Sequence, residues 1–366
     1  MTLVLTVIFV ALVFEYINGF HDTANSIATV VSTKVLTPRQ AVFMAAVTNL
    51  VGAMWGTAVA KTISSGLIDA KIVSMTSDII ICALIGAIVW NLITWWFGLP
   101  SSSSHALIGG LCGSAVAASG NNWSALVWAQ PNKEHWWLGK GLLWKVIVPM
   151  ITSPIAGFVL GFIIMAALYL LLHKCRPQRV NRFFGIAQIF SAGGMGFMHG
   201  TNDAQKTMGI IALTLVGATT AGHFDNLPSW LSFLHTPAPE HGKDLEIALW
   251  IKIACAMTMA AGTAAGGWRI IRTLGHKMVK LHPINGFAAE TSSALVIFAA
   301  TNLGIPVSTT HNISAAIMGV GSAKRFNAIK WSVVERMVWA WVLTIPVSGV
   351  IAYGLVRLFA VLGWKH

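Results

Sequence analysis

The chain carries little charge for its length and few cysteines. Only 10% of its 366 residues are charged, whereas 55% are hydrophobic. An ordinary soluble domain has about 25% charged residues, so this composition excludes one and indicates an integral membrane protein. The four cysteines show no CxxC spacing, and most of them lie in apolar stretches. We therefore expect neither a disulfide framework nor a cysteine metal cluster.

Motifs of soluble enzymes and of nucleic-acid binders are also missing. The sequence has no Gly-x-Ser-x-Gly elbow and no nucleotide-binding loop, so we expect no enzyme. The net charge of +12 comes from Lys and Arg spread over short connecting segments, without a basic helix interleaved with exposed aromatic residues. We therefore expect a lipid bilayer as the partner of this chain and no nucleic acid.

Apolar segments of about 20 residues, the length that crosses a bilayer as a helix, recur along the whole chain. They predict an all-α polytopic membrane protein of about ten spans. The first five candidates cover residues 2–33, 41–60, 79–97, 101–119 and 146–172, and the second five cover residues 183–216, 247–266, 286–303, 307–320 and 331–362. The first span of each set has a polar interruption, at residues 19–22 and 199–203, where we expect a broken helix.

Two sets of five spans predict an inverted repeat, because an odd number of crossings leaves the second copy inserted in the opposite direction. The predicted boundaries are residues 1–173 for the first repeat, 174–182 for a basic cytoplasmic linker and 183–366 for the second repeat. Most loop Lys and Arg residues then fall on one side, which the positive-inside rule assigns to the cytoplasm. We expect a multi-pass protein of the cell inner (plasma) membrane with both termini outside the cytoplasm.

One polar motif occurs twice inside these apolar segments. The run GFHDTAN at residues 19–25 returns as GTNDAQK at residues 200–206. Placing the carboxylates of Asp22 and Asp203 at membrane depth costs free energy, so aspartates there usually serve a function. Carboxylates suit a hard cation or a proton. The alternative is that each aspartate only caps the following half-helix.

The two copies of this motif differ where their chemistry matters. Asn25 corresponds to Lys206, and His21 corresponds to Asn202. A lysine in an apolar helix must pair with an acid or face a cavity, so Lys206 should contact an aspartate or a bound anion. His21 is the side chain that titrates most readily near neutral pH. His21 and the matched Asn202 join the candidates for cation or proton coupling.

Two further carboxyls, Glu15 and Glu290, lie within predicted spans. Glu15 precedes Asp22 by seven residues, about two helical turns, and Glu290 is followed by Thr291, Ser292 and Ser293. Either glutamate is a candidate proton carrier. The alternative for both is a buried carboxyl satisfied by neighbouring hydroxyl groups.

A second motif is also duplicated. GLPSSSSH at residues 98–105 returns as GIPVSTTH at residues 304–311, so each proline is followed by hydroxyl residues in the first turn of a helix. Free amides at a helix start, together with the helix dipole and hydroxyl donors, bind anions. Two such starts converging from opposite repeats would hold a tetrahedral oxyanion such as phosphate. The predicted phosphate-binding residues are Ser102, Ser103, Ser104, Ser308, Thr309, Thr310, Lys206 and Asn25.

The second motif also leaves open questions. Hydroxyl groups next to proline can simply satisfy backbone groups that the helix frees in a membrane. His105 and His311 close the two motifs, and they either contact the anion, orient hydroxyls, titrate or have a structural role. Asn91 and Thr94 precede the first copy and are weaker candidates for lining the path.

At these residues the chain resembles the inorganic phosphate transporter (PiT) family. The likeness rests on GFHDTAN, HGTNDAQK, PSSSSH and PVSTTH, and it covers essentially the whole sequence. It implies an inverted-repeat symporter of inorganic phosphate, commonly a homodimer, whose motif residues line a central ion and phosphate site. It implies no cofactor beyond the transported phosphate and a coupling H⁺ or Na⁺.

Within that family, the chain is similar to the bacterial low-affinity branch, which is proton-coupled and takes up phosphate with a divalent metal. His21 and Lys206 stand where the family usually has asparagine, so the sodium sites of other branches are in doubt here. Sodium coupling and transport of sulfate remain alternatives. An intramembrane hydrolase and a passive channel are rival functions with less support.

Overall fold

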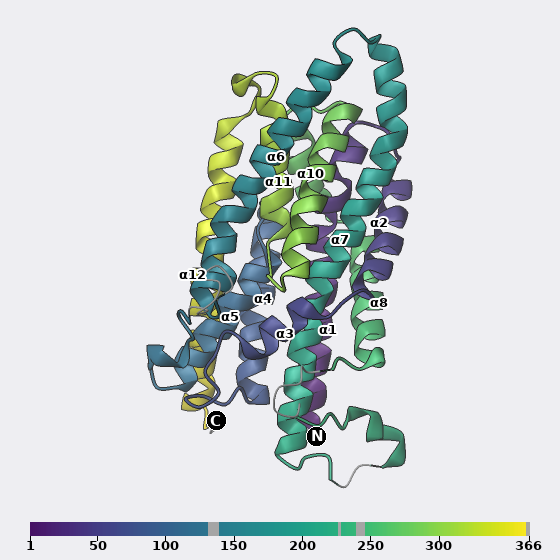
Figure 1. Ribbon diagram of the computed structural model, residues 1–366. Coiled ribbons are helices and arrows are strands. Elements are labelled where there is room, and N and C mark those ends of the chain that lie inside the picture. Colours follow the sequence, from purple (N-terminus) through teal and green to yellow (C-terminus); the bar gives the residue numbers. More distant parts are fainter. Residues whose placement is uncertain (131–138, 226–227, 239–245, 364–366) are drawn as a thin grey trace.

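The chain forms an elongated bundle of α-helices in this computed structural model (Figure 1). The structure describes residues 1–130, 139–225, 228–238 and 246–363. Within these ranges there is no β-strand, only two isolated bridges. The all-α fold predicted from the apolar composition is confirmed.

The helices follow the apolar segments of the sequence. Their bounds are α1 Thr2–Ser32, α2 Pro38–Ala53, α3 Ala58–Ser65, α4 Ser77–Phe97, α5 Ser103–Ala118, α6 Val148–Leu172, α7 Pro177–Thr220, α8 Leu249–Ala265, α9 Trp268–Arg272, α10 Pro283–Asn302, α11 Thr309–Ser322 and α12 Trp331–Val361. Shorter helical turns occur at Trp123–Ala125, Leu143–Ile147, Ser229–Leu234, Thr273–Lys277 and Phe326–Ala328.

Four helical segments in the described part of the chain are long and apolar enough to cross a membrane. They are α1, α4, the segment Leu143–Leu172 that contains α6, and α12. The pair Leu249–Ala265 and Trp268–Lys277 is a fifth candidate, bent by 58° at its break. α5 and α11 have 16 and 14 residues, which is too short for a hydrocarbon core of about 30 Å. The count of ten spans stays a prediction.

The short helices α5 and α11 belong to two helical hairpins. α5 packs against α4, and α11 packs against α10. The first hairpin occupies the lower half of Figure 1 and the second the upper half. α4 and α10 are followed by Gly98 and Gly304, whose φ angles of 64° and 61° favour glycine. The second motif therefore forms the two hairpin tips, where the chain leaves one helix and enters the next.

The prediction of helix breaks at the first motif is wrong. α1 runs without interruption from Thr2 to Ser32, and α7 runs from Pro177 to Thr220. Gly19 and Gly200 instead allow close packing between helices. A Cβ on Gly19 would lie 2.4 Å from the Met259 carbonyl oxygen, and one on Gly200 would lie 2.2 Å from that of Asn49. Because these contacts need the absence of a side chain, the glycines serve packing rather than helix termination.

Packing partners are exchanged between the two halves of the chain. α1 packs on α8 while α2 packs on α7, and α5 packs on α12 while α11 packs on α6. An inverted repeat predicts such reciprocal pairs, and the repeat relation itself stays a prediction. α6 ends at Leu172 and α7 begins at Pro177. Residues 177–182 of the expected linker are therefore the start of α7.

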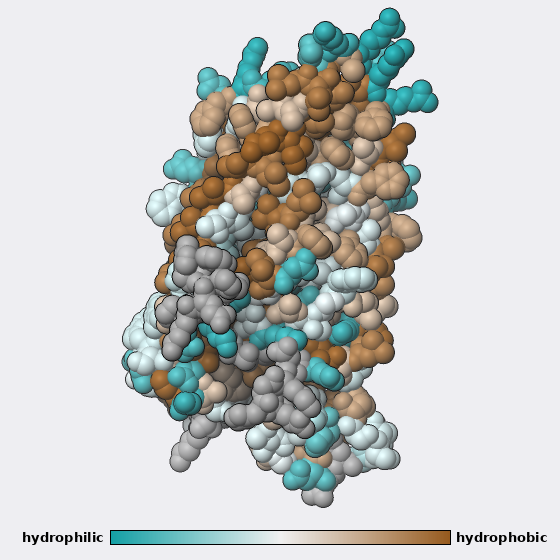
Figure 2. All heavy atoms as spheres, in the orientation of Figure 1, coloured by the Kyte–Doolittle hydropathy of each residue, from teal (hydrophilic) through white to brown (hydrophobic). Residues whose placement is uncertain are grey.

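Polar side chains gather at the two ends of the bundle, and apolar side chains cover much of the surface between them (Figure 2). Both termini lie at one end, and the α6 to α7 connection lies at the other (Figure 1). Large apolar side chains face outward along the outer helices; Phe190, for example, is 77% exposed. The fold is that of a multi-pass membrane protein.

Candidate functional site

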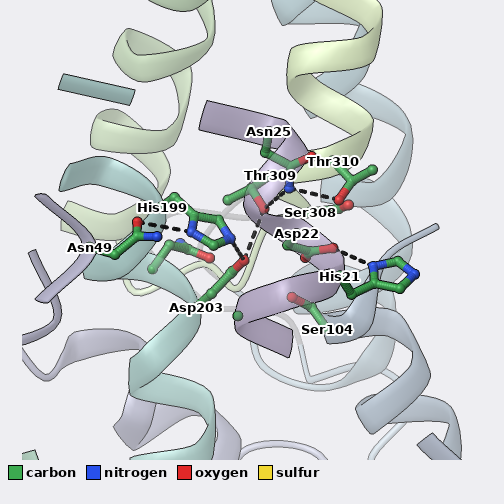
Figure 3. A network of polar contacts seen from close by, with 12 residues as sticks. His21, Asp22, Asn25, Asn49, Ser104, His199, Asp203, Ser308, Thr309 and Thr310 are labelled. Atoms are coloured by element: carbon green, nitrogen blue, oxygen red, sulfur yellow. Dashed lines mark hydrogen bonds and ion pairs between the residues drawn. The ribbon is translucent and has the colours of Figure 1, made fainter. Parts of the chain in front are cut away.

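Both hairpin tips meet in the interior of the bundle beside α1 and α7 (Figure 3). The side chain of Ser102 accepts a hydrogen bond from the His105 amide at 3.2 Å and caps α5. Ser308 accepts from the His311 amide at 3.1 Å and caps α11. The predicted helix starts are confirmed, although the helices begin at Ser103 and Thr309 rather than at the prolines. A serine cap explains this shift, because its side chain satisfies a free amide of the first turn.

Asp203 lies at the centre of the most extensive polar network. Its carboxylate pairs with the Lys206 ammonium on the same helix. The other carboxylate oxygen lies 3.0 Å from Nε2 of His199 and accepts a hydrogen bond from the Thr309 hydroxyl at 2.9 Å. Asp203 is 1% exposed, so these contacts replace its hydration, which would otherwise be lost at a cost of several kcal/mol.

Lys206 and Asn25 connect the helices to both hairpin tips. The Lys206 ammonium donates to the Ser104 hydroxyl of one tip and, at 3.2 Å, to the Val307 carbonyl of the other. The Asn25 amide donates to Thr309 at 3.1 Å and to Thr310 at 2.9 Å. The matched positions of the first motif thus hold different groups, a fixed cation and an amide, but both face the second motif.

Asp22 has a smaller network than Asp203. One carboxylate oxygen lies 2.6 Å from Nδ1 of His21, and Nε2 of that ring lies 3.1 Å from the Thr94 hydroxyl. Thr94 also accepts a hydrogen bond from Ser101 at 2.9 Å. The matched Asn202 donates to Thr301 at 2.9 Å. His21 and Asn202 therefore each bind a threonine near the end of the helix that leads into a tip.

Three ligand-type side chains come together around Asp203. Donor atoms of Asp22, His199 and Asp203 all lie within 4.8 Å of one another. Asn49 orients the His199 ring at 3.1 Å and is itself bonded to Thr263 at 3.0 Å. Carboxylate oxygens and an imidazole are suitable ligands for a divalent cation.

Sequence reasoning missed His199 and its partner Asn49. The position of His199 one turn before Asp203 places both on one face of a continuous α7, so an uninterrupted helix would have predicted this pair. Asn49 lies on α2, about 150 residues away in the sequence, and no local pattern marks it.

Several buried polar atoms near the centre have no hydrogen-bond partner in the described protein. They belong to Asn25 (Oδ1), Ser26, Asn91, Ser103 and Asn202 (Oδ1). Buried polar atoms are nearly always satisfied, so this set marks a place for oxygen-rich or hydrated ligands. Ser103 and Asn25 were predicted for phosphate, and Asn91 was predicted for the path.

His105 and His311 contact each other where the two tips meet. Their ring centroids lie 4.8 Å apart in an edge-to-face arrangement, and His311 also stacks on Trp341 at 4.3 Å. Both rings are buried. Among the roles left open by the sequence, this geometry favours a structural contact that locks the two hairpins together.

Glu15 and Glu290 lie outside this centre, each beside hydroxyl groups. Glu15 on α1 accepts a hydrogen bond from Thr207 on α7. Glu290 on α10 accepts hydrogen bonds from Thr29 on α1 and Ser191 on α7, and its oxygen lies 3.4 Å from the Gln188 amide. Both glutamates are fully buried and lack a described cationic partner.

The formal charge of the centre constrains what it can bind. Two aspartates face one lysine, while the histidines carry charge only when protonated. An entering anion would raise the buried negative charge further, which is costly in a low-dielectric interior. An accompanying cation or proton would reduce this cost for an anion that enters the centre.

The fold and this polar centre define a multi-pass membrane transporter. A model of the phosphate transporter family matches residues 18–352, and the chain belongs to that family. The probable low-affinity inorganic phosphate transporter of Bacillus subtilis is 44% identical, with 97% of this chain and 98% of that protein covered. A protein of the same description from Rhizobium meliloti is also 44% identical, with 96% and 94% covered. Because the relatives are named transporters, the chain is a transporter rather than an enzyme.

A solved structure described as the sodium-dependent phosphate transporter has the same fold. Its TM-score is 0.80 at 22% identity, with 99% of this chain and all of that chain covered. At this identity the likeness concerns the fold, and coupling must be argued from the residues of this chain.

Proposed function

We propose that this protein imports inorganic phosphate across the cell inner membrane by proton symport. The observation that supports this most is the convergence of two serine-capped helix starts on Lys206, beside Asp203. Hydroxyl donors, helix-start amides and one ammonium suit a tetrahedral oxyanion. In this proposal Ser102, Ser103, Ser104, Ser308, Thr309, Thr310, Asn25 and Lys206 surround the phosphate.

Lys206 is the group that exchanges partners in this proposal. Without substrate it neutralises Asp203 and bridges the tips. When phosphate binds, the ammonium turns to the anion and leaves Asp203 to a proton or a cation. Because a buried unpaired carboxylate is costly, phosphate binding and cation binding then favour each other, which is the basis of symport.

Protons have a suitable route on α1. Glu15, Asp22 and Thr29 follow at seven-residue intervals on one continuous helix, so they share a face and lie about 10 Å apart along it. Thr29 contacts Glu290, and Glu15 contacts Thr207. The two glutamates thus flank Asp22 on opposite sides along the helix, and each can hold a proton on its way to or from the centre.

Uptake into proteoliposomes tests the coupling. An inward proton gradient without sodium should drive phosphate accumulation, and Glu15→Gln or Glu290→Gln should make uptake insensitive to the gradient. Glu335→Gln is a matched control, because Glu335 is exposed near the start of α12. Uptake that needs sodium and ignores the proton gradient would overturn the proposal.

The cluster of Asp22, His199 and Asp203 favours a second form of the substrate, a complex of phosphate with a divalent metal. The metal would then supply the positive charge that an anion needs here. Simultaneous measurement of labelled Mn²⁺ and phosphate distinguishes the forms. Equal accumulation of both, lost together in His199→Gln, supports the complex, and phosphate uptake unchanged by chelator contradicts it. Competition by excess sulfate tests the anion's identity.

The predicted orientation has its own test because of a natural cysteine. Cys175 is exposed in the connection between α6 and α7, whereas Cys82 and Cys255 are buried. If both termini lie outside, a membrane-impermeant maleimide should label Cys175 only after cells are permeabilised. Labelling of Cys175 in intact cells would show the opposite orientation. We also propose a homodimer, which the family resemblance implies, and light scattering of the purified protein tests it.

A further inference from the structure

A cavity of about 350 Å³ lies at the end of the bundle where α6 meets α7, well away from the polar centre. Its walls come from α6, from the segment that leads into α10, and from the end of α11 with the turn that follows. The backbone amide of Lys330 donates to the Met278 carbonyl at 3.0 Å. Asn285 accepts from the His282 amide at 2.9 Å. These bonds fix the segments that form the walls.

The rim of the cavity is cationic. Lys280, Lys324 and Arg325 line it together with His282. The three basic side chains are exposed, and none of them forms an ion pair with a residue that the structure describes. Three unpaired cations from two separate segments repel one another, so an anion bound between them would lower their free energy.

The floor of the same cavity is apolar. Val279, Leu281 and Val320 line it and are at most 8% exposed. A free phosphate ion gains nothing from such a floor, because it is fully hydrophilic. A ligand with a phosphate group and an attached apolar part satisfies both the rim and the floor.

The surroundings connect the cavity to lipid. Tyr169 of α6 lines it, and the next two residues, Leu170 and Leu171, are each 75% exposed. On the other side, Phe326 and Trp331 contact each other at 4.8 Å between centroids and are 59% and 44% exposed. Exposed aromatic pairs are typical of the interface between headgroups and acyl chains. The cavity therefore opens where phospholipid headgroups lie.

We propose that this cavity binds the phosphate group of an anionic phospholipid, with Lys280, Lys324 and Arg325 around the phosphate and the glycerol and first acyl carbons over the apolar floor. Basic pockets between transmembrane helices on the cytoplasmic side commonly recognise such headgroups. Bound lipid would join α6, α10 and α11 and so stabilise the base of the second hairpin.

Lipid titration of the purified full-length protein tests this site. The thermal unfolding midpoint in detergent is measured with increasing phosphatidylglycerol, with phosphatidylcholine, and with inorganic phosphate. For the wild type we expect a larger rise with phosphatidylglycerol than with phosphatidylcholine. The double variant Lys324→Gln with Arg325→Gln should bind phosphatidylglycerol roughly 25-fold more weakly, at about fivefold for each cation removed.

A matched control removes two charges from the same end outside the cavity. Arg179→Gln with Arg182→Gln lies in the first turns of α7 and should keep the full response to phosphatidylglycerol. Equal responses of the wild type and the cavity variant would overturn the proposal, as would equal losses in both double variants. A response to inorganic phosphate that the cavity variant alone loses, without a lipid effect, would assign the cavity to free phosphate instead.

Discussion

Asp22 and Asp203 occupy matched places in the two copies of one motif, yet the structure holds them differently. Asp203 contacts Lys206, His199 and Thr309, whereas the hydrogen-bond partner of Asp22 among the described residues is the ring of His21. One carboxylate is paired with the ammonium of Lys206, and the other contacts an imidazole ring. The two copies of the motif therefore hold their aspartates in unequal surroundings, although both lie on continuous helices.

The second motif has diverged much less than the first. Ser102 and Ser308 cap their helices through the same hydrogen bond, at 3.2 Å and 3.1 Å. An anion held by helix starts needs the same donors from both sides, so both copies are constrained. In the proposed symport, cation coupling needs only the correct total charge, which the two copies of the first motif can supply in different ways.

Removal of either aspartate charge should have the largest effect on transport, and it should also show whether the two aspartates differ. We expect both Asp22→Asn and Asp203→Asn to reduce coupled phosphate uptake by about 100-fold or more, because each removes a charge worth several kcal/mol in a buried site. Stability should separate the two. Asp203→Asn leaves Lys206 as an unpaired buried cation and should destabilise the protein by about 3–5 kcal/mol, whereas Asp22→Asn should change stability little.

Uptake assays and thermal unfolding in detergent check both outcomes. Neither aspartate is a helix cap, since α1 and α7 continue through them, so a cap role cannot rescue the asparagine variants. The double variant Asp203→Asn with Lys206→Gln should regain stability but not uptake. Equal stability losses in the two single variants would contradict the inference that Asp22 and Asp203 are held by different interactions.

Lys206→Asn gives both copies of the motif an asparagine at this matched position and should have the next largest effect. It frees Asp203 from its cation, and it adds an amide at the place that Asn25 occupies in the other copy. We expect uptake to fall about tenfold or more and to become stimulated by sodium, because oxygen ligands replace the ammonium. Uptake is measured with and without sodium at constant ionic strength. Complete loss without any sodium response would mean that Lys206 acts on phosphate alone.

Thr309 joins the two halves, since it donates to Asp203 and accepts from Asn25. Thr309→Val keeps its shape and removes the hydroxyl, so we expect the KM for phosphate to rise about 30-fold through two lost hydrogen bonds of about 1 kcal/mol each. Thr214→Val is the control, because among the described residues the buried Thr214 hydroxyl donates to the Ile210 carbonyl of its own helix and to no other group. A similar KM for both variants would show that the Thr309 hydroxyl does not contribute to phosphate binding.

The parts of this architecture that depend on composition and repetition could be predicted from the sequence. Hydropathy predicted the all-α membrane fold, and the duplicated hydroxyl runs predicted a helix start at each copy of the second motif, although the exact first residues, Ser103 and Thr309, differ from the predicted prolines. The continuity of α1 and α7 could not be predicted, because a glycine that ends a helix and one that allows close packing look the same in one sequence. Contacts such as Asn49 with His199 depend on tertiary packing alone.

Gly200 provides the smallest but most direct test of how the first motif is packed. Gly200→Ala would place a Cβ 2.2 Å from the Asn49 carbonyl oxygen, so α2 must move away from α7 at a cost of about 1–3 kcal/mol. Gly194→Ala on the same helix meets no atom within 4 Å and should be neutral or slightly stabilising, because alanine favours a helix by up to about 1 kcal/mol. Thermal unfolding of both variants gives the comparison. If Gly200 served to break the helix, both alanine variants would favour the helix, and both thermal unfolding midpoints would rise. Opposite shifts of the two midpoints would show that Gly200 serves the close contact between α2 and α7 that places Asn49 beside His199.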